Sequence, residues 1–386
     1  MHRVTPSSAE DLAFALEEAA SKRRNIETAG NGSKRLMGGP IRPADVLICT
    51  RGLRRVLQYE PNDLTISVEA GMGFADLQKL LAANGQMIAL DPPFPAQATV
   101  GGIVAANSSG SLRRLFGTAR DLIIGMEFAT LDGRLVRTGG MVVKNVAGLD
   151  MGKLMIGSFG TLAVITSVNF RIHPTPEQTA TFLLSCPDLD RTVEKRDAIV
   201  GSILRPMALE IISPPAAARL GASGYLLAAR ASGSANVLAR YARELQAGER
   251  LTGAAEANWW KGISDFSAEF IRRQPNGVVL RLGTKLRDTL AVLRLISGPY
   301  ICHAGSGVTY AYLTSWQALP PLWQAAAQNG WSAAVEFAPE DKRASQELWL
   351  LDSSPARANA FVIMKKVKQM FDPNNLLNRS RLYGRI

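Results

Sequence analysis

The chain has 386 residues, of which 47% are hydrophobic and 20% are charged, and its formal net charge at pH 7 is +11. This length allows two or three folded domains, and no apolar run approaches the length needed to cross a bilayer. The basic residues lie in short, scattered clusters without interleaved aromatic residues, which argues against nucleic-acid binding and favours a surface that docks to a partner.

Strands and helices are predicted to mix in the first 172 residues. Residues 7–24 predict a helix, because serines can cap its start and acidic residues fall in its first turn. Residues 74–84 predict a second helix. The predicted strands are residues 26–29, 45–50, 65–70, 122–131 and 162–172. This order lacks the strict alternation of a doubly wound fold, so we expect an α+β fold.

Three stretches rich in glycine and other small residues interrupt these elements, at residues 30–34, 98–110 and 139–160. Glycine lets a backbone approach a diphosphate closely and offer it N–H groups. The first stretch also fits an ordinary turn, and the second also fits tight helix packing. Neither the G-x-G-x-x-G nor the G-x-x-x-x-G-K-[ST] fingerprint is present. The occurrence of all three stretches together favours a bound nucleotide.

The second half of the chain carries fewer motifs. The segment His173-Pro174-Thr175-Pro176 ends the last predicted strand and indicates a domain exit. Residues 213–224 suggest a flexible segment, and residues 355–369 predict a basic helix that ends before Phe371-Asp372-Pro373-Asn374.

The three cysteines, Cys49, Cys186 and Cys302, form no C-x-x-C pair, so we expect neither a zinc ribbon nor an iron–sulfur site. We interpret them as buried apolar residues in a reducing compartment. The first residues lack the layout of a secretory signal, and we therefore expect a cytoplasmic protein.

Five segments, together with the C-terminal F-D-P-N-N-L-L-N at 371–378, resemble one known family. They are G-N-G-S-K at 30–34, A-T-V-G-G-I-V-A-A-N-S-S-G at 98–110, G-T-A-R-D at 117–121, K-N-V-A-G-L-D at 144–150 and G-S-F-G-T-L-A-V-I-T at 157–166. The family is the vanillyl-alcohol oxidase and p-cresol methylhydroxylase (PCMH) type of FAD-binding flavoprotein, and within it the FAD-binding subunits of bacterial glycolate oxidases.

This resemblance implies a PCMH-type FAD-binding domain of two subdomains at 1–173. It further implies an α+β cap-like domain at 174–350 and a C-terminal helical segment at 351–386 that packs on the FAD domain. FAD would lie along the interface of the two subdomains.

The resemblance also implies which residues hold FAD. Gly30, Asn31, Gly32, Ser33 and Lys34 would wrap the pyrophosphate. The flavin and phosphate path would be lined by Thr99, Gly101, Gly102 and Asn107. Gly160, Thr161 and Ile165 would lie at the adenosine or flavin edge, beside a wall formed by Lys144, Asn145 and Asp150.

The chain departs from the family pattern at two places. Leu149 stands where relatives usually have Tyr, and Asn378-Arg379-Ser380-Arg381 replaces Asn-Pro-Gly-Arg. Only His2, His173 and His303 exist, and none lies in the loops at 30–34 or 98–110, so we expect non-covalent FAD.

Catalytic relatives carry H-x-G-D-G-N-x-H and G-E-H-G segments, often with a metal. Here residues 303–310 read H-A-G-S-G-V-T-Y, and no Glu-His segment exists. One histidine cannot form a metal site alone, and we interpret His303 as a structural remnant. The resemblance therefore implies an FAD-binding subunit that is not catalytic alone, in a glycolate oxidase (glycolate dehydrogenase) complex.

The expected partners are a catalytic flavoprotein subunit and an iron–sulfur subunit, with peripheral association at the inner membrane through the complex. Two alternatives stay open. One is a self-sufficient FAD-dependent 2-hydroxy-acid dehydrogenase that uses His303 with an arginine such as Arg281. The other is a FAD-less scaffold subunit.

Overall fold

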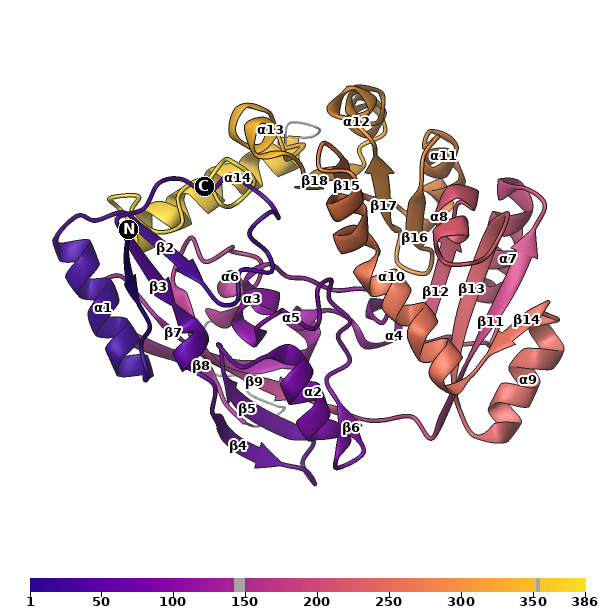
Figure 1. Cartoon of the computed structure of the whole chain (residues 1–386), viewed down its shortest axis with the longest axis horizontal. Helices are drawn as coiled ribbons and strands as arrows, with labels where there is room; N and C mark the ends of the chain where they lie inside the picture. The colour runs from indigo at the N-terminus through magenta and orange to yellow at the C-terminus, as the bar shows by residue number, and fades with distance from the viewer. Residues whose placement is uncertain (142–149, 352–354) are drawn as a thin grey trace.

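The computed structural model describes residues 1–141, 150–351 and 355–386, and Figure 1 shows two lobes. The first lobe comprises residues 1–174 and the second lobe residues 178–345. The C-terminal helix α14 (Pro355–Phe371), drawn in yellow, returns to the first lobe (Figure 1). Helices and strands mix as predicted, and the α+β fold class is confirmed.

A three-stranded parallel sheet opens the first lobe. Its strands, in spatial order, are β1 (His2–Val4), β3 (Val46–Cys49) and β2 (Ile26–Ala29). Helix α1 (Ala9–Ser21) contacts this sheet and buries Leu12 and Leu16 completely. It begins at Ala9, two residues after the predicted start, and the Ser8 hydroxyl caps it by accepting the Asp11 N–H at 3.0 Å. It ends at Ser21, three residues before the predicted end.

A five-stranded antiparallel sheet forms the rest of this lobe. Its strands, in spatial order, are β4 (Val56–Glu60), β5 (Thr65–Glu69), β9 (Val164–Arg171), β7 (Ile123–Ala129) and β8 (Leu135–Gly139). The inner strands β5, β7 and β9 match predicted strands. The edge strands β4 and β8 were not predicted, because their residues are mostly half-buried or exposed and so lack a clear apolar pattern.

Short elements connect these strands. They are the 3-10 helix η1 (Thr50–Gly52), α2 (Phe74–Ala82), α3 (Val100–Ala105), α4 (Arg113–Phe116), α5 (Ala119–Leu122), α6 (Gly152–Met155), and the paired β6 (Gln86–Met87) and β10 (His173–Pro174). The proline-rich exit after β10 leads directly to the second lobe (Figure 1).

The second lobe is built on an eight-stranded antiparallel sheet. In spatial order it contains β14 (Glu249–Leu251), β11 (Gln178–Cys186), β13 (Tyr225–Gly233), β12 (Ala208–Ile212), β16 (Tyr300–His303), β17 (Val308–Leu313), β15 (Val278–Gly283) and β18 (Ser332–Phe337). Its helices are α7 (Leu189–Gly201), α8 (Pro214–Arg219), α9 (Ala235–Leu245), α10 (Gly253–Arg273), η2 (Leu286–Asp288), α11 (Thr289–Arg294), η3 (Trp316–Ala318), α12 (Leu319–Gln328) and α13 (Glu340–Ser345).

One local prediction for this lobe is wrong. The segment at 213–224 is not merely a flexible loop, because α8 occupies its first half. Pro214 begins this helix, where its fixed φ and missing N–H favour a helix start. Ala216 and Ala217 are fully buried there.

The end of α14 is joined to the first lobe and to the tail by buried polar contacts. The Lys368 ammonium group donates to the Thr161 carbonyl at 2.8 Å and pairs with Asp372 at 2.6 Å.

The domain boundaries at 173 and 350 stay predictions, although the chain changes sheet between β10 and β11. All three cysteines are buried, as predicted. Within the described residues, no helix has the length and hydropathy of a membrane span.

Candidate functional site

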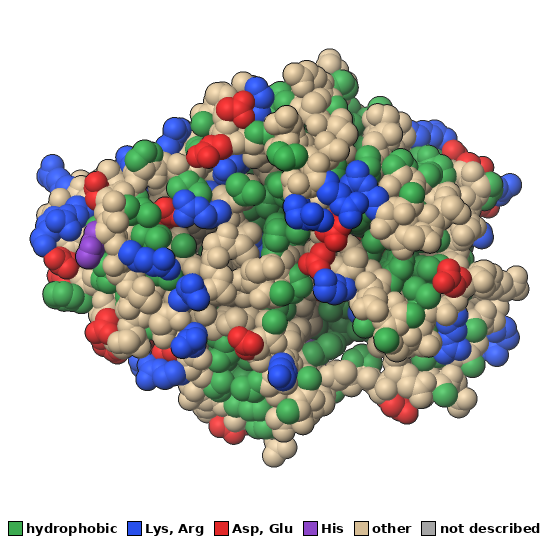
Figure 2. Space-filling view, viewed as in Figure 1, with side chains coloured by type: hydrophobic (Ala, Val, Ile, Leu, Met, Phe, Trp, Pro, Cys, Tyr) green, Lys and Arg blue, Asp and Glu red, His purple; other side chains and the backbone are tan. Residues whose placement is uncertain are grey.

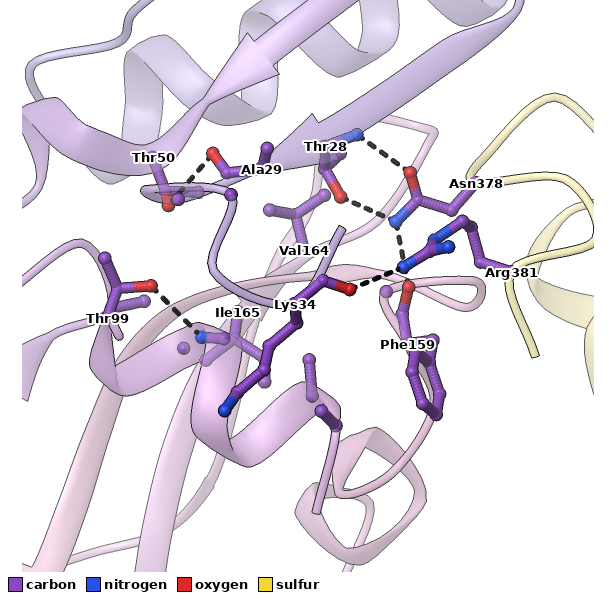
Figure 3. Close-up of a pocket in the computed structure, with 18 of the residues that line it drawn as sticks. Thr28, Ala29, Lys34, Thr50, Thr99, Phe159, Val164, Ile165, Asn378 and Arg381 are labelled. Atoms are coloured by element: carbon purple, nitrogen blue, oxygen red, sulfur yellow. Dashed lines mark hydrogen bonds between the residues drawn. The ribbon is translucent and has the colours of Figure 1, made fainter. Parts of the chain in front are cut away.

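A pocket lies in the first lobe where β2, α3 and the start of β9 meet the C-terminal tail (Figure 3). It holds about 850 Å³ of space that no atom fills, part of it open to solvent. Ligand pockets typically measure about 300–1,000 Å³. The lining residues are Glu27, Thr28, Ala29, Gly30, Asn31, Gly32, Ser33, Lys34, Arg35, Ile41, Thr50, Ala70, Thr99, Gly101, Gly102, Ala105, Ala106, Phe159, Gly160, Ala163, Val164, Ile165, Asn378 and Arg381.

The loop after β2 supplies the first wall. Among the described residues, no hydrogen bond uses the N–H groups of residues 31–34. Successive free N–H groups are the donors that bind phosphate oxygens. A Cβ on Gly30 would lie 2.9 Å from the Thr99 Cγ2 and closer still to its hydroxyl, so only glycine fits there. The loop therefore fits an anionic group such as a diphosphate.

Helix α3 supplies the second wall. The Thr99 hydroxyl caps it by accepting the Gly102 N–H at 3.3 Å. A Cβ on Gly101 would lie 2.8 Å from the Cβ of Ala70, so Gly101 is explained by tight packing against the end of β5. Gly102, Ala105 and Ala106 line the pocket, and their small size leaves room for a flat ligand.

The third wall is the turn before β9. Phe159 and Gly160 both have positive φ, +54° and +66°, and a Cβ on Gly160 would lie 2.7 Å from the Asn378 side-chain nitrogen. This left-handed turn is where glycine is favoured. Val164 and Ile165 follow it and present apolar side chains to the pocket (Figure 3).

The C-terminal tail completes the pocket with two residues that were not among the predicted ligands. Asn378 bonds to Thr28 and to the Phe159 carbonyl (Figure 3). Arg381 donates to the carbonyls of Lys34 at 3.1 Å and Met37 at 3.0 Å. Asn378 ends the tail segment that resembles the family, whereas Arg381 lies beyond it, in the stretch that departs from the family pattern but keeps its final arginine.

Ten of the fifteen predicted FAD ligands line this one pocket. They are Gly30, Asn31, Gly32, Ser33, Lys34, Thr99, Gly101, Gly102, Gly160 and Ile165. Their contact with FAD stays a prediction.

The other five predicted ligands are not part of the described lining. Asn107 is exposed at the far end of α3. Thr161 is buried and donates its hydroxyl hydrogen to the Ser158 carbonyl at 2.7 Å. Asp150 is exposed and pairs with Lys153 at 2.9 Å. Lys144 and Asn145 lie outside the described residues, as does Leu149.

His303 lies in the second lobe, at the end of β16. Its Nδ1 contacts both carboxylate oxygens of the fully buried Glu210, at 2.9 and 2.8 Å. The Tyr310 ring, at the position of the family's second histidine, lies 5.4 Å from the imidazole ring. Arg281 pairs with Glu336 at 2.5 Å. No group of three or more metal-binding side chains occurs in the described part of the chain.

Comparison with known proteins agrees with this geometry. The family model described as "FAD binding domain" matches residues 2–139. Glycolate oxidase subunit GlcE of Escherichia coli (strain K12) is 34% identical over 163 residues, which are 42% of this chain and 46% of that protein. Glycolate oxidase subunit GlcD of Bacillus subtilis (strain 168) is 26% identical over 212 residues, 55% of this chain and 45% of that protein. These matches span about half the length of each relative.

The solved structures extend the similarity over the whole fold. The 4-ethylphenol oxidase from Gulosibacter chungangensis, in an isoeugenol complex, superposes with a TM-score of 0.73 at 16% sequence identity. The superposition covers 98% of this chain and 88% of that chain. At this identity the likeness is one of fold. Taken together, the matched domain and the glycine-lined pocket show that the first lobe contains an FAD-binding domain of the PCMH type, with FAD as its cofactor.

Proposed function

We propose that the chain is the FAD-binding subunit of a glycolate oxidase complex that oxidises glycolate to glyoxylate. Its partners are a catalytic flavoprotein subunit and an iron–sulfur subunit, to which it is linked by electron transfer. The observation that carries the proposal is the pocket whose glycine-rich loop leaves its N–H groups free for a diphosphate. The names of the two curated relatives, both glycolate oxidase subunits, support the substrate and the complex.

The second lobe supports an accessory rather than a catalytic role. Oxidation of a 2-hydroxy acid needs a base for the hydroxyl group and a cation for the carboxylate, with FAD as the electron acceptor. Tyr310 lies beside His303 at the position where catalytic relatives carry a second histidine. Arg281, a cation available for a carboxylate, is already paired with Glu336.

We further propose that FAD is held without a covalent bond. The described lining of the pocket contains no histidine, cysteine or tyrosine that could form one. Acid precipitation should release all of the FAD into solution. FAD that stays with the precipitated protein would contradict this. The expected location is the cytoplasm, with peripheral association at the inner membrane through the complex.

Purification of the chain tests the main proposal. The isolated protein should show a flavin absorption spectrum that 10-fold excess glycolate does not bleach within the dead time of rapid mixing or over minutes. Bleaching should appear when the flavoprotein and iron–sulfur subunits from the same cell are added. Rapid bleaching of the isolated chain would overturn the accessory role. A colourless protein without FAD by mass spectrometry would favour the scaffold alternative.

The pair of Glu210 and His303 favours one second candidate, a self-sufficient 2-hydroxy-acid dehydrogenase. A buried carboxylate that holds one imidazole nitrogen orients the ring and supports the other nitrogen as a base. In that reaction Nε2 would take the substrate's hydroxyl proton while FAD accepts the hydride. His303→Gln should then abolish bleaching by glycolate, whereas the matched variant His173→Gln should retain it. Equal rates in both variants would exclude this candidate.

A further inference from the structure

Lys34 places a buried ammonium group in the pocket directly after the loop with free N–H groups. Its residue exposure is 9%, and its side chain extends into the pocket (Figure 3). The Nζ donates to the Pro93 carbonyl and lies 5.0 Å from the centre of the Phe94 ring. An ammonium group has three hydrogens to donate, so two remain after the Pro93 contact.

The other charged groups around the pocket already have partners. Glu27 pairs with Arg35 at 2.7 Å on the β2 side. Arg381, from the tail, donates to loop carbonyls. On β18, Glu336 acts on Lys34 electrostatically but is bonded to Arg281. Across the described residues, no carboxylate comes within 4.0 Å of the Lys34 Nζ to form an ion pair.

We propose that the Lys34 ammonium group forms the ion pair with the diphosphate of bound FAD, and that Lys34 takes up a proton from solvent when FAD binds. The inference rests on the proposal that this pocket holds FAD. The two phosphates of FAD bring two negative charges next to the amine, and a nearby negative charge favours its charged form. The loop N–H groups would then bind phosphate oxygens beside it.

The charge of Lys34 in the protein without FAD follows from its burial. Burial lowers the pKa of Lys34 to about 7, and the attraction of Glu336 only partly opposes the effect. Glu336 is itself ion-paired with Arg281 at 2.5 Å and interacts electrostatically with Tyr310 and Tyr383. Without FAD, the amine is therefore largely neutral at pH 8. With FAD, it is charged throughout the neutral range.

Calorimetry of FAD binding to the apoprotein, in buffers with different ionisation enthalpies, measures the proton. We expect an uptake of about 0.9 proton per FAD at pH 8 and about 0.5 at pH 7. The Kd should also rise about eightfold between pH 7.5 and 8.5. No proton uptake by a wild-type protein that binds FAD would overturn the inference and leave FAD binding intact. Failure to bind FAD at all would instead overturn the proposed function.

Two substitutions assign the proton to Lys34. Lys34→Met removes the charge and should raise the Kd about 10- to 100-fold at pH 7. Lys34→Arg keeps a charge that does not titrate in this range. Both variants should bind FAD without proton uptake and with a Kd independent of pH. Because Lys34→Arg retains the cation, it serves even where Lys34→Met fails to fold. Unchanged proton uptake in either variant would contradict the assignment, and the exposed Lys79→Met is the matched control.

ADP-ribose distinguishes the diphosphate from the flavin ring as the partner of Lys34. It carries the same diphosphate between two sugars but no flavin. Its inhibition constant against FAD should rise in Lys34→Met by the same factor as the Kd of FAD. An unchanged inhibition constant, or no competition in the wild type, would contradict pairing with the diphosphate.

Discussion

Asn378 and Thr28 are separated by 350 residues in the chain and form two hydrogen bonds with each other. The Asn378 Oδ1 accepts the Thr28 N–H at 2.8 Å, and its Nδ2 donates to the Thr28 hydroxyl at 2.8 Å (Figure 3). Around this pair, Ile26 and Leu377 form a parallel bridge. The last residues of the chain therefore extend the parallel sheet and form one side of the pocket.

Asn378→Ala should destabilise the protein and weaken FAD binding. The substitution leaves the Thr28 N–H, the Thr28 hydroxyl and the Phe159 carbonyl without their partner. Each unsatisfied buried group costs about 1–3 kcal/mol, and partial access to water reduces the sum. We expect a loss of about 2–4 kcal/mol in the free energy of unfolding, measured with urea on the apoprotein.

Asn329 provides the control for this variant. It is exposed at the end of α12, and its amide makes one local bond to the Ala325 carbonyl. Asn329→Ala should change the unfolding free energy by less than about 1 kcal/mol. Equal losses in the two variants would show that Asn378 has no special role.

Arg381→Met should raise the Kd of FAD more than it lowers stability. Arg381 donates to the carbonyls of Lys34 and Met37 and so holds the loop that carries the free N–H groups. Burial lowers its pKa to about 10, so it stays charged at neutral pH. Loss of these bonds frees the loop, and FAD binding then has to order it. We expect a Kd increase of about 10-fold or more by fluorescence titration.

The neighbouring Arg379 tests whether this effect is specific. It is half-buried and donates to a single carbonyl, that of Pro43. Arg379→Met removes the same charge from the same tail, so its Kd for FAD should stay within about twofold of the wild type. A large increase for both variants would point to net charge instead of loop order.

Features that depend on a few neighbouring residues were predictable from the sequence. The cap at Ser8 and the strand that ends before Gly30 each follow from local pattern, and both are present. Ten of the residues that the family resemblance implied as FAD ligands line one pocket. Thr161 does not line this pocket, because the left-handed turn at Phe159 and Gly160 redirects the chain in a way that spacing does not reveal. The contact between Asn378 and Thr28 depends on tertiary structure alone.

Gly30→Ala should disturb the pocket through Thr99. The added methyl group would overlap the Thr99 side chain, which caps α3. Overpacking of this kind typically costs about 1–3 kcal/mol. We expect a lower melting temperature and a weaker affinity for FAD.

A double variant tests whether overlap with the Thr99 side chain causes the loss of stability. Gly30→Ala combined with Thr99→Ala removes the overlapping hydroxyl and methyl groups, so it should be more stable than the sum of the two single changes. Gly201→Ala is the matched control, because nothing lies within 4 Å of a Cβ at that position. Strict additivity of the two single changes would rule out the predicted contact.

Asp91→Asn should make the protein more stable at neutral pH. Burial raises the pKa of Asp91 to about 6, an effect that the nearby His303 partly offsets. Its carboxylate accepts the N–H groups of Gly110 at 3.0 Å and Leu112 at 3.2 Å, which an asparagine oxygen can also accept. The substitution therefore keeps the loop contacts and removes only the titrating charge.

The sign of the pH dependence of stability follows from the number of protons that the folded and unfolded states bind. Because the folded pKa lies above the unfolded value of 3.8, the folded state binds more protons between about pH 4 and 6. Stability from this group is thus fully present below pH 4 and is lost as the pH rises to 6. At pH 7 the wild type should be about 1–3 kcal/mol less stable than Asp91→Asn, since each pKa unit corresponds to about 1.4 kcal/mol and partial exposure reduces the effect. Urea unfolding of both proteins from pH 4 to 7 measures this difference. Curves that stay parallel over the whole range would show that Asp91 has an ordinary pKa.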